Sequence, residues 1–454
     1  MATPLKALAN LISSSVQTLE SAYSKKGVAF PSLDDPFQPG SLNNEPDVET
    51  ATNLIIAAAH QIIATVRQPV DTVYDYAPAM YMSAALGLAV DINVPDVLKD
   101  VGPQGLHVNE IGREVEIDGD MLARVLRYLA TRHVFREVAP NVFANNRLSS
   151  ILVKAHPFGQ LKANQLTKYD GASTAAMVGH FTDDAFKSSV SLATYLRSPR
   201  EDSETPLNLA WGTNASMWEW FQEGGNKWRG RRFFTAITGA FEHFPPALFT
   251  DGEWCRLSIY LPDGSVVVDV GGGVGPVTLL LAKAFPNLKF VVEDQEEVIS
   301  TLRARKFWED QAPNAIADGS VLLKVQNFFE PQTVKHAAVY FLRMIMHDWP
   351  DSACVVILKN LRAAASSSSK LVIFDAMMPY ACADPSGPPS PYPLLGNLGL
   401  AVGGFVTMFD LQMLTLLNGK ERTLSQFAQL GAASGWKFEG VRPGIFAAFE
   451  FSAA

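Results

Sequence analysis

The spacing of hydrophobic residues changes near the middle of the chain. Before residue 250, apolar side chains recur every three or four positions, which predicts helices with one buried face. One such run extends from Met82 to Val101 and ends near Gly102-Pro103, and another comprises Ile55, Ile56, Ala59, Ile62, Ile63 and Val66. After Asp251, short apolar runs alternate with segments of helical length. The pattern predicts a mostly helical domain over residues 1–250 and an α/β domain over residues 251–454.

Four of the later apolar runs have the length and composition of β-strands. They are residues 266–270, 290–294, 338–342 and 371–375. Strands that are apolar on both faces and alternate with helices are typical of a parallel sheet covered by helices on both sides. The predicted fold class of the second domain is therefore α/β, with a parallel central sheet.

Two further segments complete the predicted α/β domain. Ala447 to Phe451 is expected to add a late edge strand, after a helix that Thr423 and Gln426 open with a capping box. The stretch from Cys382 to Pro393 is rich in Pro, Ser and Gly and is expected to form an ordered surface loop or lid. It is too short to link two domains.

A unit at about residues 80–150 has the order helix, helix and two-stranded ribbon. The helical segments are 106–111 and 118–129, and the ribbon strands 134–138 and 142–144 turn at Pro140-Asn141. That order is typical of a winged helix, and many winged helices bind DNA. The second helix and its end carry Arg124, Arg127, Arg132 and His133, but Asp118, Asp120 and the acidic total oppose a DNA surface. A scaffold or dimerisation role is expected instead.

Composition narrows the classes of partner. The chain is 48% hydrophobic and 18% charged, with 37 basic and 46 acidic residues and a formal charge of −9. It is expected to be globular and without a nucleic-acid partner. The 3 cysteines are too few and too far apart for a disulfide framework or a zinc cluster. No metal site is predicted.

The chain shows no pattern expected of a membrane or secreted protein. Its longest charge-free apolar stretch, Leu398 to Phe409, is shorter than the roughly 20 residues of a membrane span. The first residues, Met1 to Ser15, lack the charged start and continuous apolar region of a signal peptide. We therefore expect no membrane partner and a cytoplasmic location.

A glycine-rich turn follows the first predicted strand. The segment 269–276, DVGGGVGP, joins that strand to a helix expected over residues 277–285. Glycine at such a turn lets a ligand approach the backbone, because a side chain would occupy the same space. Pro276 stands where the dinucleotide fingerprint needs a glycine, so a pyrophosphate fits poorly. Glycine for structural reasons alone is the alternative interpretation.

An acidic residue on the next strand makes this turn a candidate nucleoside site. Gly271, Gly273 and Gly275 have GxGxG spacing, and Asp294 ends the following strand. A carboxylate there can accept hydrogen bonds from both hydroxyls of a ribose. Glu293 is the alternative acid. The pattern predicts a nucleoside ligand without phosphates, of which S-adenosyl-L-methionine is the common example.

Five motifs resemble those of one enzyme family. DVGGGVG, FVVEDQEEV, FLRMIMHDWPD, LVIFDAMMP and LLNGKERT occur in the order and spacing of class I S-adenosylmethionine-dependent O-methyltransferases of the plant caffeate type and their fungal relatives. The resemblance covers nearly the whole chain, and its ANNRLSS and KFWE segments look fungal. It implies a Rossmann-like catalytic domain after a helical winged-helix and dimerisation domain. It also implies a homodimer that transfers a methyl group to a hydroxyl of an aromatic or polyketide-like small molecule.

The resemblance also assigns residues to the cofactor. Gly271, Gly273 and Asp294 are implied to bind the nucleoside, with Asp269 and Gly275 of the same turn assigned beside them; Asn327 and Phe328 are implied to lie at the adenine, and Arg343 near the methionine end. Asn327 departs from the family, which usually has an aspartate that accepts from the adenine amino group. An amide oxygen accepts with weaker charge assistance, so this substitution is expected to affect cofactor affinity.

Methyl transfer to a phenol or enol also requires loss of the acceptor's proton, so a base is expected. His347 lies just past the predicted strand 338–342, at the carboxyl edge of the sheet. Its imidazole titrates near neutrality, and a carboxylate behind it would stabilise the imidazolium. Asp375 and Glu421 are the candidate partners. The family has its base and flanking acids at these three positions.

Structural roles are the alternatives for these residues. His347 would then cap the helix that begins near Asp351, and Asp375 would cap the end of its strand. Asp348 and Asp351 are interpreted as acids at a helix start, where acidic residues are favoured.

Substrate contacts are expected mainly from the helical half. An aromatic and methionine-rich set there consists of Trp211, Met217, Trp218, Phe221, Phe234 and Phe241. His180 is a polar candidate, and Met413, in the second half, is another candidate for the pocket. Ordinary core packing is the alternative for each apolar residue.

Two other functions stay open. Some fungal proteins resembling this family bind S-adenosylmethionine without spending its methyl group and catalyse dehydration or pericyclic ring formation, using the sulfonium charge to polarise a carbonyl. A winged-helix regulator with a vestigial cofactor fold is the third hypothesis. The presence of His347 favours methyl transfer.

Overall fold

The protein forms two compact units, each described here by itself. The computed structural model describes residues 3–40, 42, 45–198, 204–242, 247–250, 261–300, 302–384, 389–442, 444 and 446–454. The first unit comprises Met1–Arg200, Glu204–His243 and Tyr380–Gly404, and the second comprises Glu201–Ser203, Phe244–Pro379 and Phe405–Ala454. No helix among the described residues is long and apolar enough to cross a lipid bilayer.

The two units are not separated by one boundary at residue 250, which the sequence pattern predicted. Tyr380–Gly404, which contains the Pro-rich stretch, belongs to the first unit although it follows the second unit's central strands. Within the first unit, Gln61 Nε2 donates to the Pro393 carbonyl at 2.7 Å, and η4 (Gly399–Ala401) packs against α2 (Pro46–Val66). These contacts join positions that are hundreds of residues apart in sequence.

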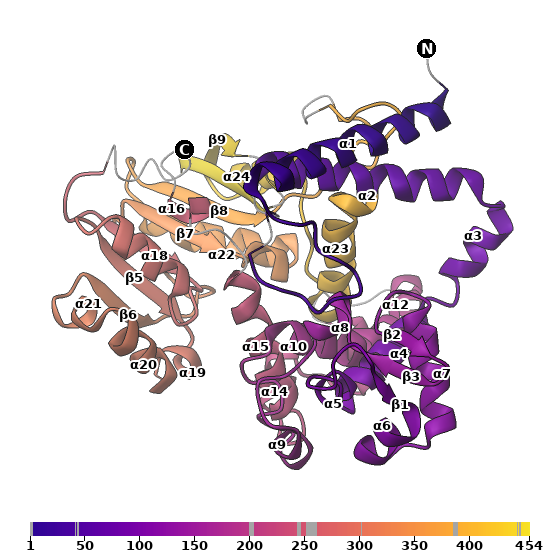
Figure 1. Ribbon diagram of the computed structural model, residues 1–454. Coiled ribbons are helices and arrows are strands. Elements are labelled where there is room, and N and C mark those ends of the chain that lie inside the picture. The colour runs from indigo at the N-terminus through magenta and orange to yellow at the C-terminus, as the bar shows by residue number, and fades with distance from the viewer. Residues whose placement is uncertain are drawn as a thin grey trace. The chain divides into compact units, whose positions relative to one another are not determined.

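The first unit is mostly helical (Figure 1). Besides α2, its helices are α1 (Pro4–Lys26), α3 (Pro69–Tyr76), α4 (Met80–Asp91), α5 (Val94–Val97), α6 (Val108–Val115), α7 (Gly119–Ala130), α8 (Arg147–Ser150), α9 (Phe158–Ala163), α10 (Ser173–His180), the π-helical η2 (Phe181–Ala185), α11 (Phe186–Ser189), α12 (Leu192–Arg197), α13 (Pro206–Trp211), α14 (Met217–Gln222) and α15 (Lys227–Glu242).

The apolar stripe predicted over residues 55–66 lies on α2, which runs beside α1 (Figure 1). Ile55, Ile56, Ala59 and Ile62 are half-buried, whereas Ile63 is 47% exposed and Val66 61% exposed. The buried residues at the centre of α2 are Ala57 and Ala58, which do not belong to the predicted stripe. The stripe is therefore partly covered along most of its length and accessible at its end.

The unit of helix, helix and ribbon is present with one correction. Strands β1 (Leu106–His107), β2 (Arg136–Ala139) and β3 (Val142–Ala144) form a three-stranded sheet in the order β1-β3-β2. Leu106 and His107 are therefore strand, and the helix expected from residue 106 begins at Val108. The predicted run from Met82 is interrupted at Asn93, whose φ of 65° lies in the left-handed region and ends helical geometry between α4 and α5.

The second unit is built on a seven-stranded sheet in the order β6-β5-β4-β7-β8-β10-β9. Its strands are β4 (Val266–Val270), β5 (Lys289–Asp294), β6 (Val321–Val325), β7 (Val339–Arg343), β8 (Lys370–Ala376), β9 (Trp436–Arg442) and β10 (Phe446–Ala453). Its helices are α16 (Ala247–Thr250), α18 (Pro276–Ala284), α19 (Glu296–Ile299), α20 (Leu302–Gln311), α21 (Pro313–Ala317), the 3₁₀ turn η3 (Met346–Asp348), α22 (Asp351–Ala364), α23 (Gly403–Leu417, whose first two residues belong to the first unit) and α24 (Leu424–Ala433).

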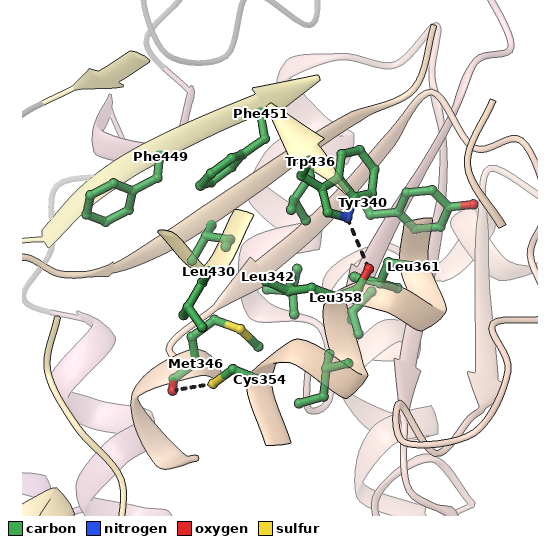
Figure 2. Close-up of a cluster of buried hydrophobic side chains, with 14 of the residues drawn as sticks. Tyr340, Leu342, Met346, Cys354, Leu358, Leu361, Leu430, Trp436, Phe449 and Phe451 are labelled. Carbon is green, nitrogen blue, oxygen red and sulfur yellow. Dashed lines mark hydrogen bonds between the residues drawn. The ribbon is translucent and has the colours of Figure 1, made fainter. Parts of the chain in front are cut away.

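The sheet is parallel from β6 to β8, as the apolar runs predict, and antiparallel from β8 to β9. Alternate residues of β7 enter different cores: Tyr340 and Leu342 face one cluster, and Val339 and Phe341 face the other. Figure 2 shows the first cluster, where α22, α24 and the strands meet. Burial on both faces explains why these strands read as continuous apolar runs.

Three strands of the sheet, β6, β9 and β10, differ from the prediction. The sequence pattern did not indicate β6 or β9, which occupy the two edges of the sheet. The segment expected as an edge strand, β10, instead lies between β8 and β9. The capping box is confirmed: the Thr423 hydroxyl accepts from the Gln426 N–H, and the Gln426 side chain accepts from the Thr423 N–H.

Candidate functional site

The glycine-rich turn lies at the carboxyl end of β4, the strand from which the sheet order reverses. Gly271, Gly273 and Gly275 have φ values of 72°, 63° and 91°, which only glycine adopts readily. A Cβ on Gly271 would lie 2.6 Å from the Ile345 side chain, and one on Gly275 would lie 2.8 Å from Trp308. A Cβ on Gly273 would meet no atom within 4 Å. Gly273 is therefore the point where the turn opens to a ligand.

Asp294 joins the end of β5 to this turn. Its Oδ2 accepts from the Gly273 N–H at 2.8 Å, and its Oδ1 accepts from the Gln295 N–H at 2.8 Å. Partial burial raises the pKa of Asp294, while the two backbone N–H groups oppose that shift. Each carboxylate oxygen has a further lone pair, so Asp294 retains acceptor capacity for ligand hydroxyls.

Glu293, the alternative acid, faces the interior. It is 1% exposed, and its Oε2 accepts from Gln332 Nε2 at 2.6 Å. Burial raises the pKa of Glu293, opposed by the Gln332 hydrogen bond. The carboxylate that contacts the glycine turn is that of Asp294, whereas Glu293 contacts the turn through its backbone carbonyl.

Asp269 and Arg343 lie beneath and beside the turn. Asp269 is buried, accepts from the Thr278 hydroxyl at 2.5 Å and has its pKa raised to about 6, because burial outweighs that hydrogen bond and the Arg343 charge. Burial lowers the pKa of Arg343 to about 10, against the charges of Asp269 and Asp375. Asp269 thus supports the turn from inside the protein, where the sequence alone suggested a ligand contact.

Asn327 and Phe328 follow β6, next to the end of β5. The Asn327 side-chain oxygen accepts from the Phe329 N–H at 3.0 Å. A Cβ on Gly271 would lie 3.7 Å from the Phe328 ring, which places Phe328 over the start of the glycine turn. Both residues come just after β6, which pairs with β5, the strand that ends at Asp294.

Trp308 is a residue of this site that the sequence analysis did not assign. It is fully buried on α20, and its indole N–H donates to the Val274 carbonyl at 2.9 Å. It therefore fixes the turn between Gly273 and Gly275. The KFWE segment contains this residue, but nothing in the local pattern indicates a contact with a turn more than 30 residues away.

His347 lies on η3, just after β7, whose neighbour in the sheet is β4. The ring is almost fully buried, and Nδ1 lies 2.8 Å from Glu421 Oε1. Burial opposes the charged imidazolium and so lowers the pKa of His347. Nearby acids outweigh burial and raise that pKa to about 10: Asp348 by its charge, Glu421 by its hydrogen bond and charge, and Asp375 by its charge. The ring does not cap a helix, because α22 begins at Asp351 behind Pro350.

The acids around His347 have different roles from those that the sequence suggests. Asp348 is not at a helix start: its Oδ1 lies 3.4 Å from His347 Nε2. Asp351 does begin α22 and pairs with Lys420 and Arg422. Glu421 is positioned in turn by its backbone N–H, which donates to Asp410 at 2.8 Å.

Asp375 holds the backbone of the histidine turn. It is fully buried, and its Oδ2 accepts from the Met346 N–H at 3.1 Å. Burial raises the pKa of Asp375 to about 7, opposed by the nearby His347 charge. Asp375 acts on the imidazole through its charge and through the turn, and Glu421 is the direct partner.

Asp348→Asn is expected to shift the pH profile of kcat/KM. A base works only when unprotonated, so activity should rise with pH as His347 loses its proton. The Asp348 charge is the largest of the charge effects that raise the pKa of His347, so its neutralisation lowers that pKa and moves the rising limb to lower pH. Initial rates from pH 6 to 10 measure the shift. An unmoved limb would show that another group is titrating.

The candidate pocket residues of the helical unit are mostly packed within it. Met217 is 2% exposed, and His180 is fully buried with Nδ1 at 2.9 Å from Asp184. Trp211 is half-buried and donates to Ser188 at 3.2 Å, and Phe234 is half-buried against Phe233.

Of the remaining candidates, Trp218 is half-buried and Phe221 fully buried in the same unit. The side chain of Phe241 lies outside the described residues. Met413 is buried on α23 in the second unit, and its carbonyl accepts from the Gly419 N–H at 3.1 Å.

The glycine turn fits S-adenosylmethionine. Gly273 leaves open the space that a side chain would fill, Asp294 offers acceptors, and Phe328 provides an aromatic face. A nucleoside without phosphates needs hydroxyl acceptors and a flat apolar contact more than it needs a cradle of N–H groups. These are the groups present.

Comparison with known proteins gives matches over both units. The family model of the O-methyltransferase domain matches residues 258–437, and that of the O-methyltransferase dimerisation domain matches residues 74–155. The chain is 35% identical to 4-O-methyltransferase 1 of Phanerochaete chrysosporium, over 96% of this chain and 95% of that protein. It is 36% identical to an O-methyltransferase of Armillaria gallica, over 97% of this chain and 96% of that protein.

Solved structures share the fold. The mitomycin 7-O-methyltransferase MmcR is 22% identical with a TM-score of 0.63, covering 85% of this chain and 98% of its own. A pericyclic reaction enzyme is 21% identical with a TM-score of 0.65, covering 89% and 94%. At this identity the fold alone is shared, and it serves both reaction classes. The sequence relatives are decisive: the chain belongs to the S-adenosylmethionine-dependent O-methyltransferase family.

Proposed function

We propose that this enzyme transfers a methyl group from S-adenosylmethionine to a hydroxyl of an aromatic or polyketide-like small molecule, with His347 as the general base. The observation that carries the proposal is the buried pair of His347 and Glu421 at the carboxyl end of β7, next to the β4 glycine turn. Open α/β sheets bind their ligands at this edge, where the strand order reverses.

Different residues of the second unit bind the cofactor and remove the proton from the substrate. When bound, S-adenosylmethionine supplies an electrophilic methyl group on a positively charged sulfur. Asp294 and the open side of Gly273 orient the nucleoside. His347 Nε2 receives the acceptor's hydroxyl proton as the new O–CH₃ bond forms and the S–CH₃ bond breaks. Glu421, at Nδ1, orients the ring and stabilises the imidazolium.

Cofactor stoichiometry tests methyl transfer against the pericyclic alternative. The enzyme is incubated with methyl-labelled S-adenosylmethionine and a panel of phenols and hydroxylated polyketides, and the products are separated. Label in an O-methyl ether, with one S-adenosylhomocysteine formed per turnover, is the expected result. Isomerised or dehydrated product at constant cofactor would contradict methyl transfer. The histidine-carboxylate pair favours the first outcome, since it is suited to removing a proton from a hydroxyl.

We further propose that the protein is a homodimer whose interface includes α3 and the start of α4, with the predicted winged-helix unit as part of the dimerisation domain. Among the residues of α3 none is buried, and its apolar side chains point to solvent: Val70, Val73, Tyr74 and Tyr76 are 52%, 60%, 72% and 66% exposed. This surface continues into the segment that matches the dimerisation domain. Monomers rarely leave so much contiguous apolar surface in water.

Light scattering after size exclusion is expected to give a mass near twice 49.4 kDa. Val73→Asp combined with Tyr74→Asp should halve that mass at micromolar concentration, because two charges would be buried without partners. Ile316→Asp changes another exposed apolar residue, 43% exposed, on α21 and serves as the control. A dimer that persists in the double variant would place the interface elsewhere.

A further inference from the structure

Arg422 is a buried cation that contacts both ends of the histidine turn. Its side chain has no exposed surface. Nη1 donates to the Met346 carbonyl at 2.5 Å, and Nη2 donates to the Trp349 carbonyl at 2.7 Å. Nε donates to Asp351 Oδ1 at 2.8 Å. One guanidinium therefore spans η3, from the residue before His347 to the residue after Asp348.

The chain preceding Arg422 lies directly against the same turn. The Lys420 N–H donates to the His347 carbonyl at 2.8 Å. A Cβ on Gly419 would come within 2.1 Å of that carbonyl oxygen, so a side chain cannot be placed there. The segment 419–422 thus supports the turn through backbone and side chain, and it also carries Glu421, the partner of the imidazole ring.

The backbone of Met346, the residue before His347, is held on both sides. Its N–H donates to Asp375, and its carbonyl accepts from Arg422 and, at 3.3 Å, from Cys354 Sγ. Figure 2 shows the Cys354 contact at the base of the apolar cluster. Met346 itself is fully buried in that cluster. The turn is therefore anchored below by packing and beside by a charged donor.

Arginine suits this position for a geometric reason. Its planar fork presents several N–H groups in fixed directions, whereas a lysine ammonium is a single point on a flexible stem. A lysine could keep the positive charge near Asp351 but could not reach the Met346 and Trp349 carbonyls together. A buried carbonyl that loses its donor is unfavourable, so the loss favours rearrangement of the turn.

We propose that Arg422 is a positioning residue for methyl transfer: it fixes the backbone of the Met346–Trp349 turn so that His347 meets the acceptor hydroxyl. This inference rests on the proposed role of His347 as base. Arg422 contacts neither the glycine turn nor Asp294 in any hydrogen bond, so its effect should fall on turnover and not on cofactor affinity.

Arg422→Lys is the first test. We expect kcat to fall by about 10- to 100-fold, since a displacement of about 1 Å in a catalytic group has an effect of this size. The KM of the acceptor and the Kd of S-adenosylmethionine, measured by calorimetry, should stay within about threefold. Arg362→Lys is the matched control, because Arg362 also donates to two carbonyls, those of Gly435 and Ala454, away from the turn. Its kcat should stay within about twofold.

A double-mutant cycle separates positioning from general damage. If Arg422 acts through His347, Arg422→Lys should lower kcat by less than about twofold in the His347→Gln background. Asp351→Asn removes the charge of a half-exposed carboxylate that pairs with Arg422, so the guanidinium is held less firmly but is still present. We expect a smaller loss of kcat than in Arg422→Lys, with the same dependence on His347. This variant replaces Arg422→Lys in the test if the lysine variant does not fold. Equal losses in both backgrounds, or unchanged kcat in Arg422→Lys, would overturn the positioning role alone. If His347→Gln left kcat unchanged, both the role of His347 as base and this inference would be overturned.

Discussion

His347→Gln is expected to lower kcat by about 10² to 10⁴, the range for loss of a general base. Glutamine is close to histidine in size and can still donate to Glu421, so the buried carboxylate keeps a partner and the turn should stay folded. The substitution removes the ring nitrogen, Nε2, that takes the proton from the substrate hydroxyl. The Kd of S-adenosylmethionine should change by less than about threefold, because the ring is not part of the glycine turn.

The control for this experiment is His336→Gln, the same substitution at an exposed histidine of the second unit. It should leave kcat unchanged within about twofold. Initial rates at saturating cofactor, with binding followed separately by calorimetry, distinguish turnover from affinity. A His347→Gln enzyme with normal turnover would mean that the imidazole is structural and that another group accepts the proton.

Asp294→Ala is expected to raise the Kd of S-adenosylmethionine by about 10- to 100-fold. Hydrogen bonds to a charged group contribute about 1.5–3 kcal/mol each, and the carboxylate both holds the Gly273 N–H and offers acceptors to ribose hydroxyls. The effect should appear equally with S-adenosylhomocysteine, since the two ligands share the nucleoside. Calorimetry with both ligands measures it, without any need for the acceptor.

Two companion variants make the test specific. Glu293→Gln alters the neighbouring buried acid and should leave the Kd of S-adenosylmethionine within about threefold. A large rise in Kd for Glu293→Gln, with no change for Asp294→Ala, would assign the ribose contact to Glu293. Asn327→Asp should tighten binding by about three- to tenfold. An aspartate could keep the hydrogen bond from the Phe329 N–H and offer a negatively charged oxygen to the adenine amino group, which is a stronger acceptor than the amide oxygen of Asn327.

Local sequence determined the elements whose character depends on near neighbours. The strands β4, β5, β7 and β8 are buried on both faces, so their apolar runs are visible without any knowledge of their partners. The glycines of the turn, the acid that ends β5 and the Thr423 capping box are likewise set by a few consecutive residues. These features were sufficient to predict the parallel sheet and to point to a nucleoside site at its edge.

Only the tertiary structure decided which distant residues meet. Edge strand β6 has exposed Leu322 and Val325, so its pattern lacks the signature of a buried strand. His347 and Glu421 are 74 residues apart, and Trp308 reaches a turn 34 residues away. The roles of Asp348 and Arg422 depend on contacts with a turn that forms only when β7 and the segment before α24 come together. The spacing of residues along the chain shows which of them share one face of a helix or strand. Which distant residues come into contact depends on how the segments pack, and the local sequence of one segment does not indicate its partner.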